Sequence, residues 1–471
     1  MAGCAVGPEY RRPEGEAPEQ FSQATGGEHR YGRPGIPWWQ GFQDPRLDQL
    51  IALVSTNNLD LKRATARLHE ARALWTEARF DYIPTVRADA AYEKSQTSKD
   101  FTGFRDRNTE LYQAGFDATW ELDLWGRVRR GVEAARATVA TVEATRDDLR
   151  VTLQAELAAN YFELRGTQAA LEVSTRNATN QSRTLDLAVA LRDGGQGTQL
   201  DVARAKALLN ETLALVPRRQ AMIQRAIHRI SVLCGLPPGA LSADLESPVG
   251  FPKLPQQVDL ARPAELLRAR PDVRAAERAL AAAHARMRGE VANLFPTVTL
   301  NGSVRLEAGS FSGMTLPGGD TYRFGPRLTW AAFDMGRVRQ RIKAADARAL
   351  GALAAYEQTV LLVLEEAENS LVTLSRERER LAYLIEAERA ASEAVVLARQ
   401  RYGDGVADYL SVLDAERTLL NLQDQVVVTQ TTVATRLVAV YKAFVSGLGF
   451  EGENVPVETV PDSLPGGSGK D

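Results

Sequence analysis

Residues 112–129 read YQAGFDATWELDLWGRVR, and this stretch holds the two patterns that decide the fold. From Tyr112 to Leu122 apolar and polar residues alternate, which is the period of a β-strand. After Gly126 the apolar residues recur at steps of three and four, which is the period of a helix. No proline occurs from residue 85 to residue 216. The stretch therefore predicts a strand that is followed closely by a very long helix.

The same stretch occurs twice in the chain. Trp120 and the GRVR run that begins at Gly126 recur as Trp330 and the GRVR run that begins at Gly336, at an offset of 210 residues. A period of this length indicates the duplication of one large unit and not a solenoid of short repeats.

The repeat and the distribution of proline suggest five parts: an extended N-terminal segment (1–45), a first repeat (46–236), a Pro-rich linker (237–262), a second repeat (263–450) and a disordered tail (451–471). In the first repeat we expect strands at about 84–98 and 109–122, and long helices at about 127–193 and 198–235. In the second repeat we expect strands at about 296–308 and 322–333, and long helices at about 337–402 and 407–447. The fold is thus expected to be mainly α-helical with a smaller β section.

The four strands have properties of membrane-spanning strands. They run about 10–13 residues, longer than the usual five or six and enough to cross a bilayer at a tilt. Aromatic residues such as Tyr92 and Trp330 lie near strand ends, as in an interfacial girdle. A sheet packed on a water-soluble core also alternates, so the pattern alone leaves that alternative open. Four strands cannot close a barrel, so strands that span a membrane would require several copies to share one barrel.

The helices are also unusual. A helix of about 65 residues would be about 100 Å long, and apolar spacing of three and four residues over such a length predicts coiled-coil packing. Helix pairs are expected to turn back near Gly194 and Gly403. The molecule would therefore have a short β section at one end and long helix pairs projecting from it.

The composition argues against several classes of protein. The chain has 57 Lys and Arg against 60 Asp and Glu, a net charge of −3, and so no basic face for nucleic acid. Two cysteines exclude a disulfide scaffold, and four scattered histidines argue against a metal centre built from histidine. We find no run of about 18 apolar residues, which we interpret as the absence of a transmembrane helix. No G-x-S-x-G, H-E-x-x-H or Walker motif occurs, so we expect no enzyme and no cofactor.

Cys4 is the candidate site of lipid attachment. Ala2-Gly3-Cys4 resembles the end of a bacterial lipobox, whose cysteine is lipidated after cleavage. No apolar stretch of a secretory signal precedes it, so our hypothesis is that translation begins upstream of Met1. The alternative is a chance occurrence of these three residues near a terminus.

The whole chain resembles the TolC family of outer-membrane efflux proteins, in the NodT-type lipoprotein branch of OprM and OprN. The segments that carry the resemblance are residues 4–13 (CAVGPEYRRP), 37–39 (PWW), 120–127 (WELDLWGR), 270–277 (RPDVRAAE), 401–405 (RYGDG) and 413–417 (LDAER). Several such motifs in the same order over the full length make a chance likeness improbable.

The resemblance implies a homotrimer with a 12-stranded β-barrel that continues into a 12-helix α-barrel. It implies a lipid-anchored protein of the bacterial outer membrane with a large periplasmic portion. Its partners would be a periplasmic adaptor, also called a membrane fusion protein, and an inner-membrane pump of the resistance-nodulation-division class. The protein would be a passive exit duct for drugs or other small molecules.

The resemblance also implies a periplasmic gate at Leu410, Asp414 and Arg417, which share one helix face at i, i+4 and i+7. At the 210-residue offset the first repeat has Leu200, Arg204 and Ala207, so the acid and base pair occurs in one repeat only. Without the family, the alternative is that Leu410 is a coiled-coil core residue and that Asp414 and Arg417 form an ordinary surface pair.

Glycines mark the two expected hairpin tips, namely Gly194, Gly195, Gly197, Gly403 and Gly405. The tips match the ends of family members that dock the adaptor. Ordinary turn chemistry explains the same glycines, because glycine readily adopts positive φ. Both interpretations can hold together.

Other functions remain open at the level of sequence. The duct could serve type I protein secretion or metal-ion export, since channel sequences distinguish cargo poorly. A soluble coiled-coil scaffold is the alternative of a different class, and it does not explain the four alternating strands.

Overall fold

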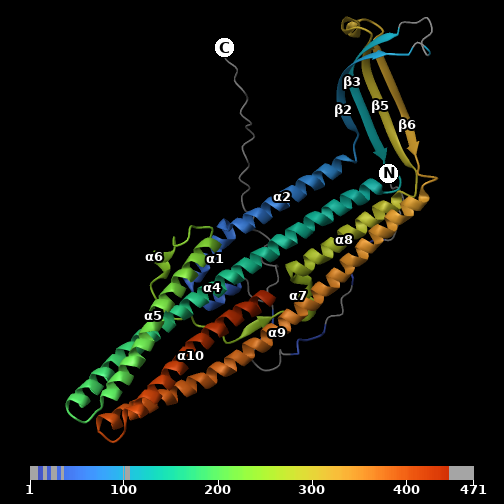
Figure 1. Cartoon of the computed structure of the whole chain (residues 1–471). Helices are drawn as coiled ribbons and strands as arrows, with labels where there is room; N and C mark the ends of the chain where they lie inside the picture. Colours follow the sequence, from blue (N-terminus) through green and yellow to red (C-terminus); the bar gives the residue numbers. More distant parts are fainter. Residues whose placement is uncertain are drawn as a thin grey trace, which may run out of the picture.

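The computed structural model describes residues 9–13, 18–22, 29–32, 37–98, 100 and 107–444. The molecule is elongated, with a β-sheet at one end and two helical hairpins at the other (Figure 1). The first repeat contains α1 (Pro45–Asn57), α2 (Leu59–Phe80), β2 (Thr85–Gln96), β3 (Asn108–Leu122), α4 (Arg127–Asp193) and α5 (Gln199–Leu233). The second contains α7 (Pro263–Ala269), α8 (Pro271–Ala292), β5 (Thr297–Ala308), β6 (Asp320–Thr329), α9 (Met335–Gly403) and α10 (Tyr409–Phe444).

The two longest helices run most of the length of the helical section. α4 has 67 residues and α9 has 69, so each is about 100 Å long at 1.5 Å per residue. Near the sheet, α4 packs with α2 and α8, and α8 packs with α9; near the hairpins, α4 packs with α5 and α10, and α10 packs with α9. Pro217 lies inside α5, where it removes one backbone hydrogen bond of the helix.

The four long strands form one antiparallel sheet in the order β2-β3-β5-β6. The two repeats meet at its centre, where β3 pairs with β5. Throughout the sheet, even-numbered residues pair with even and odd with odd: Ala88 pairs with Phe116, Phe116 with Val304, and Val304 with Tyr322. Because side chains alternate along a strand, all even positions lie on one face and all odd positions on the other. The register therefore combines the four apolar strand faces into one continuous apolar face.

Short elements occupy parts of the N-terminal segment and the linker that we expected to be irregular. They are β1 (His29–Tyr31), the 3-10 helix η1 (Trp38–Phe42), α6 (Ser242–Leu245) and β4 (Val258–Leu260), with a second 3-10 helix, η2 (Phe311–Thr315), in the loop after β5. β1 pairs in parallel with β4. This pair and α1 belong to the main hydrophobic core at mid-length, where Phe42, Phe162 and Phe444 are fully buried. The described elements η1, α1, α6 and the β1–β4 pair thus pack against the long helices at mid-length, and together they are called the belt.

One result differs from the sequence prediction on membrane helices. Among the described residues, α9 is long and apolar enough to cross a membrane, with a mean hydropathy of 1.2 over 18 residues. A single such helix is weak evidence for a membrane span, because buried helices of soluble proteins pass the same test. Only 22% of this window is buried within the chain, so α9 exposes an apolar surface.

Candidate functional site

The two hairpin tips have the same backbone structure. At the first, the N–H groups of Gln196 and Gly197 both donate to the carbonyl of Leu191, at 2.8 and 3.0 Å. At the second, Val406 and Ala407 donate to Arg401 at 2.9 and 3.2 Å. These bonds satisfy carbonyls at the ends of α4 and α9 that have no partner within their helices. The 210-residue repeat therefore extends to individual hydrogen bonds.

Of the five predicted tip glycines, two have the positive φ that favours glycine. Gly195 has φ +74° and Gly405 has φ +71°. Gly194 has φ −79°, and Gly403 is the last residue of α9. Gly197 is close to the end of α4, since a Cβ there would lie 3.0 Å from the backbone nitrogen of Arg192. Turn geometry thus explains Gly195 and Gly405 but not Gly194 or Gly403.

A side-chain cap begins the helix after each tip, and the first of the two caps is reciprocal. Thr198 accepts from the N–H of Asp201 at 3.2 Å, and the Asp201 side chain accepts from the N–H of Thr198 at 3.0 Å. In the second hairpin the types are exchanged, and Asp408 accepts from both the N–H and the hydroxyl of Ser411. Such caps satisfy backbone donors at the start of α5 and α10 and fix where each helix begins.

The three predicted gate residues lie together on an exposed face of α10. Leu410 is 50% exposed, and Asp414 and Arg417 are also exposed. The opposite face of α10 is buried in a cluster at the hairpin ends that includes Tyr409, Val412 and Leu413. Leu410 is therefore not a core residue of the single chain. Its counterpart Leu200 is likewise exposed, at 56%.

Arg417 and Asp414 do not form the pair that their spacing suggests. The Arg417 guanidinium lies 3.6 Å from the carboxylate of Glu211, on α5 of the first repeat. Both side chains are more than half exposed, so this pair contributes little to stability. Asp414 has no ion pair or side-chain hydrogen bond within the described residues. A free carboxylate and an exposed leucine on one helix face are consistent with contacts to another copy of the chain.

A buried polar junction that the sequence prediction does not include lies beside these residues. Glu416 is 5% exposed, and its Oε1 accepts from Arg399 Nε of α9 and from Thr184 Oγ1 of α4, both at 2.9 Å. Glu416 lies on the same helix face as the buried residues Tyr409, Val412 and Leu413 of α10. A glutamate on an otherwise apolar helix face is a sequence pattern that could have indicated this junction. Burial, with the Glu416 charge close by, also raises the pKa of the Tyr409 hydroxyl. The junction ties α10 to both neighbouring helices near the tip.

The odd-numbered face of the sheet carries an ion cluster. Arg305 of β5 pairs with Asp117 of β3 and lies 3.4 Å from Asp89 of β2. Gly115 separates Asp89 from Arg305 in the ladder, and a Cβ there would lie 2.6 Å from the Arg305 Cγ. Because glycine has no side chain, the Arg305 side chain can pass over β3 at this position and reach Asp89. A hollow of about 590 Å³ lies on this face, lined by Asp89, Asp117 and Glu121 among others.

The even-numbered face is apolar and exposed within the single chain. Its exposed side chains include Val86, Phe116, Val304, Phe324 and Leu328. Two tryptophans lie at equivalent positions at the end of the sheet that adjoins the helices. Trp120 Nε1 donates to the carbonyl of Tyr82, and Trp330 Nε1 donates to that of Leu294, both at 3.1 Å. Indole rings with an apolar body and a satisfied N–H are typical of membrane interfaces.

Cys4 lies outside the described residues, which begin at residue 9. The Tyr10 hydroxyl donates to Glu277 Oε1 of α8 at 2.8 Å, and its ring lies 5.6 Å from that of His284. α8 ends at Ala292, shortly before β5 begins. Tyr10 therefore lies against α8, the helix that leads to the sheet.

Comparisons with known proteins agree with this geometry. A family model described as outer membrane efflux protein matches residues 50–236 and 263–444. Nodulation protein T of Rhizobium leguminosarum bv. trifolii is 30% identical over 426 residues, which cover 89% of each chain. Outer membrane protein OprJ of Pseudomonas aeruginosa is 30% identical over 423 residues, which cover 89% of this chain and 88% of OprJ. The structure of the outer-membrane channel OprN is 40% identical and covers 94% of this chain and 99% of OprN, with a TM-score of 0.88.

Proposed function

Because this chain belongs to the family of outer membrane efflux proteins, we propose that it works as a trimer whose gated periplasmic end docks on a pump assembly. The chain itself is an outer-membrane exit duct of an efflux system, in a family of channels and not of enzymes. The predicted TolC-like fold is confirmed by the match to OprN. The soluble-scaffold alternative is wrong, since the family resides in the outer membrane.

The single observation that carries a barrel shared between copies is that the chain has two open sides. β2 and β6 are the edges of the sheet, and each has an unpaired row of backbone groups. Such edges are costly in lipid, where each unsatisfied group costs several kcal/mol. Pairing β6 of one copy with β2 of the next would satisfy them, and three copies would give the 12-stranded barrel. Its apolar even face would meet lipid and its charged odd face would line the channel.

The helices have matching open sides. α9 flanks one side of the layer, and α2 and α5 flank the other. Leu350, Leu361 and Leu362 on α9 are each more than half exposed, as are Leu59 and Leu74 on α2. Packing α9 against α2 and α5 of the next copy would bury this apolar surface. The same three-fold arrangement would then close the sheet and the 12-helix barrel together.

The N-terminal segment supports a lipid anchor at Cys4. Tyr10 bonds to Glu277 of α8, the helix that leads to β5. The six residues from Tyr10 back to Cys4 could span up to about 20 Å, which is comparable with the roughly 22 Å that α8 runs from Glu277 to its end at Ala292. One acyl chain would add only modest binding to a protein already held by its strands.

The tips are the proposed docking ends for a periplasmic adaptor, with a resistance-nodulation-division pump as the source of energy. Val406, 69% exposed at the second tip, is an apolar contact available to such a partner. The gate would lie close to this end. Three-fold symmetry would place Leu410, Asp414 and Arg417 of each copy around the axis, with Leu200 close by.

Single-channel recording in planar bilayers tests the gate. Asp414→Ala with Arg417→Ala removes the proposed charged ring and only a weak exposed pair with Glu211, so conductance should rise severalfold. The matched control is Arg183→Ala with Asp186→Ala, an exposed pair of the same spacing on α4. Unchanged conductance in the gate variant, or an equal rise in the control, would refute the gate.

A further inference from the structure

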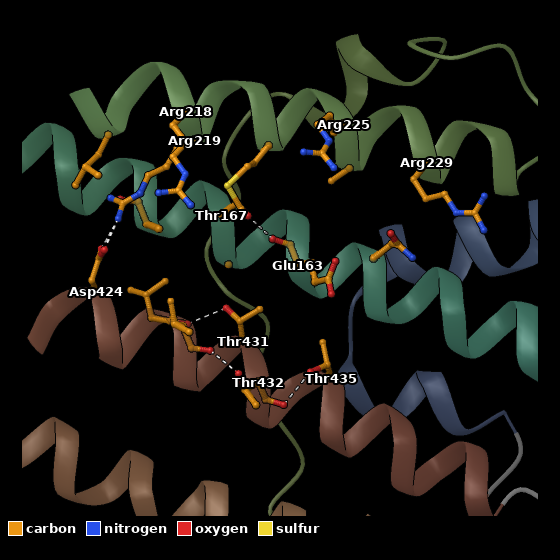
Figure 2. Close-up of a pocket in the computed structure, with 18 residues that line it drawn as sticks. Glu163, Thr167, Arg218, Arg219, Arg225, Arg229, Asp424, Thr431, Thr432 and Thr435 are labelled. Carbon is orange, nitrogen blue, oxygen red and sulfur yellow. Dashed lines mark hydrogen bonds and ion pairs between the residues drawn. The ribbon is translucent and has the colours of Figure 1, made fainter. Parts of the chain in front are cut away.

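A groove of about 830 Å³ runs between α4, α5 and α10. Figure 2 shows its walls: Arg218, Arg219, Arg225 and Arg229 lie along α5, and Asp424, Thr431, Thr432 and Thr435 lie along α10. This volume is in the range of sites for drug-sized molecules. The groove belongs to neither the tips nor the gate.

The base of the groove is apolar. Gly166 and Ala170 of α4 line it, and a Cβ at Gly166 would lie 1.9 Å from Thr431 Oγ1, so glycine allows α10 to approach α4 closely. Met222 is 44% exposed and Val428 is 59% exposed, and both line the groove. These exposed side chains form an apolar surface large enough to contact an aromatic or aliphatic body.

Two of the four arginines are already engaged. Arg219 is 8% exposed, donates to the carbonyl of Ala170 at 2.5 Å and pairs with Asp424. Arg229 Nε donates to Glu156 at 3.0 Å. Their charges are therefore compensated, and they act as part of the wall.

Arg218 and Arg225 differ from these two. They lie seven residues apart on one face of α5, about 10 Å along the helix. Within the described residues, neither has an ion pair or side-chain hydrogen bond. The groove has two acidic lining residues, Asp424 and Glu163. Asp424 is paired with Arg219, so the two free guanidinium groups face only the carboxylate of Glu163. The groove thus has an excess of uncompensated positive charge beside an apolar surface.

The orientation of α4 indicates which way the groove faces. Arg165 donates to the carbonyl of Ser247 and Gln168 to that of Leu245, so this side of α4 packs on the belt. Glu163, Gly166 and Ala170 lie on the opposite side at 100° per residue. If the belt surrounds the helical barrel, the groove opens into the duct. This step rests on the proposed trimer.

We propose that the groove is a transient binding site for amphipathic organic anions on the cargo path through the duct. A carboxylate or sulfonate would bind Arg218 or Arg225, whose guanidinium geometry matches such groups. The apolar part of the molecule would pack on Met222 and Val428. The groove therefore favours anions with an aromatic or aliphatic body over neutral molecules of the same shape.

Block of single-channel current tests this proposal. The probe is 8-anilinonaphthalene-1-sulfonate, and N-phenyl-1-naphthylamine is the neutral analogue that lacks the sulfonate. The anion should block the wild-type channel at lower concentration than the analogue. Arg218→Gln with Arg225→Gln should raise the half-blocking concentration of the anion about tenfold, the loss of one charge-assisted contact. It should leave block by the analogue unchanged.

Arg176→Gln with Arg183→Gln is the matched control, because these exposed arginines have the same spacing on the belt-facing side of α4. The anion should block this control variant at the same half-blocking concentration as the wild-type channel. Equal block by the anion in all three proteins, or a similar loss in the control, would overturn the proposal. A wild-type protein that forms no channel would instead overturn the proposed trimeric assembly, so the two failures are distinguishable.

Discussion

At the scale of single residues, Glu416 shows what a linear reading misses. The resemblance points to Asp414 and Arg417, which both lie exposed, while Glu416 between them is buried against α4 and α9. Helical phase could have identified Glu416, because it lies in the buried phase of α10. The partner of Arg417 could not be predicted, since Glu211 belongs to the other repeat and the packing of α5 beside α10 is not visible in the sequence.

Glu416→Gln should loosen the hairpin end of α10. The substitution keeps the size of the side chain but weakens the bonds from Arg399 and Thr184, at a cost of about 1–3 kcal/mol. Faster hydrogen exchange in the first turns of α10 would report this local opening. Glu393→Gln, an exposed glutamate on α9, should leave exchange unchanged, and the same rates in both variants would show that the Glu416 junction does not hold the hairpin.

At the scale of elements, strand and helix periods predicted the long segments well because each pattern persists over many residues. The four alternating strands and the four longest helices have clear periods, and the register places all even residues on one face. The three-residue strands β1 and β4 and the four-residue α6 are too short for any period. Prolines around them favoured a linker, but burial in the central core orders them.

The exposed apolar side of α9 provides an element-scale prediction. Leu361, 62% exposed in the single chain, should be buried against the next copy. Leu361→Glu would bury a charge there, so it should lower the proportion of trimer severalfold in size-exclusion chromatography without unfolding the chain. Val249→Glu, at a site of 60% exposure outside this helix, is the control. A normal trimer of the Leu361 variant would mean that this side of α9 is not the interface.

At the scale of the whole molecule, each half has the same construction, and the chain is open at both sides. The sequence repeat indicated the duplication, and the count of four strands indicated that one copy cannot close a barrel. Neither pattern fixed which edges meet. The strand order β2-β3-β5-β6 makes β2 and β6 the free edges of the sheet. In the helical layer α9 lies on one side, and α2 and α5 lie on the other. The same arrangement of copies would close both the sheet and the helical layer.

The number of copies is the most direct test of this account, because the barrel, the gate ring and the groove facing the duct all depend on it. Native mass spectrometry of the purified protein, released from detergent in the gas phase, measures it. We predict a complex of three times the mass of one mature chain, with no abundant monomer. A stable monomer, a dimer or a larger ring would contradict the 12-stranded barrel.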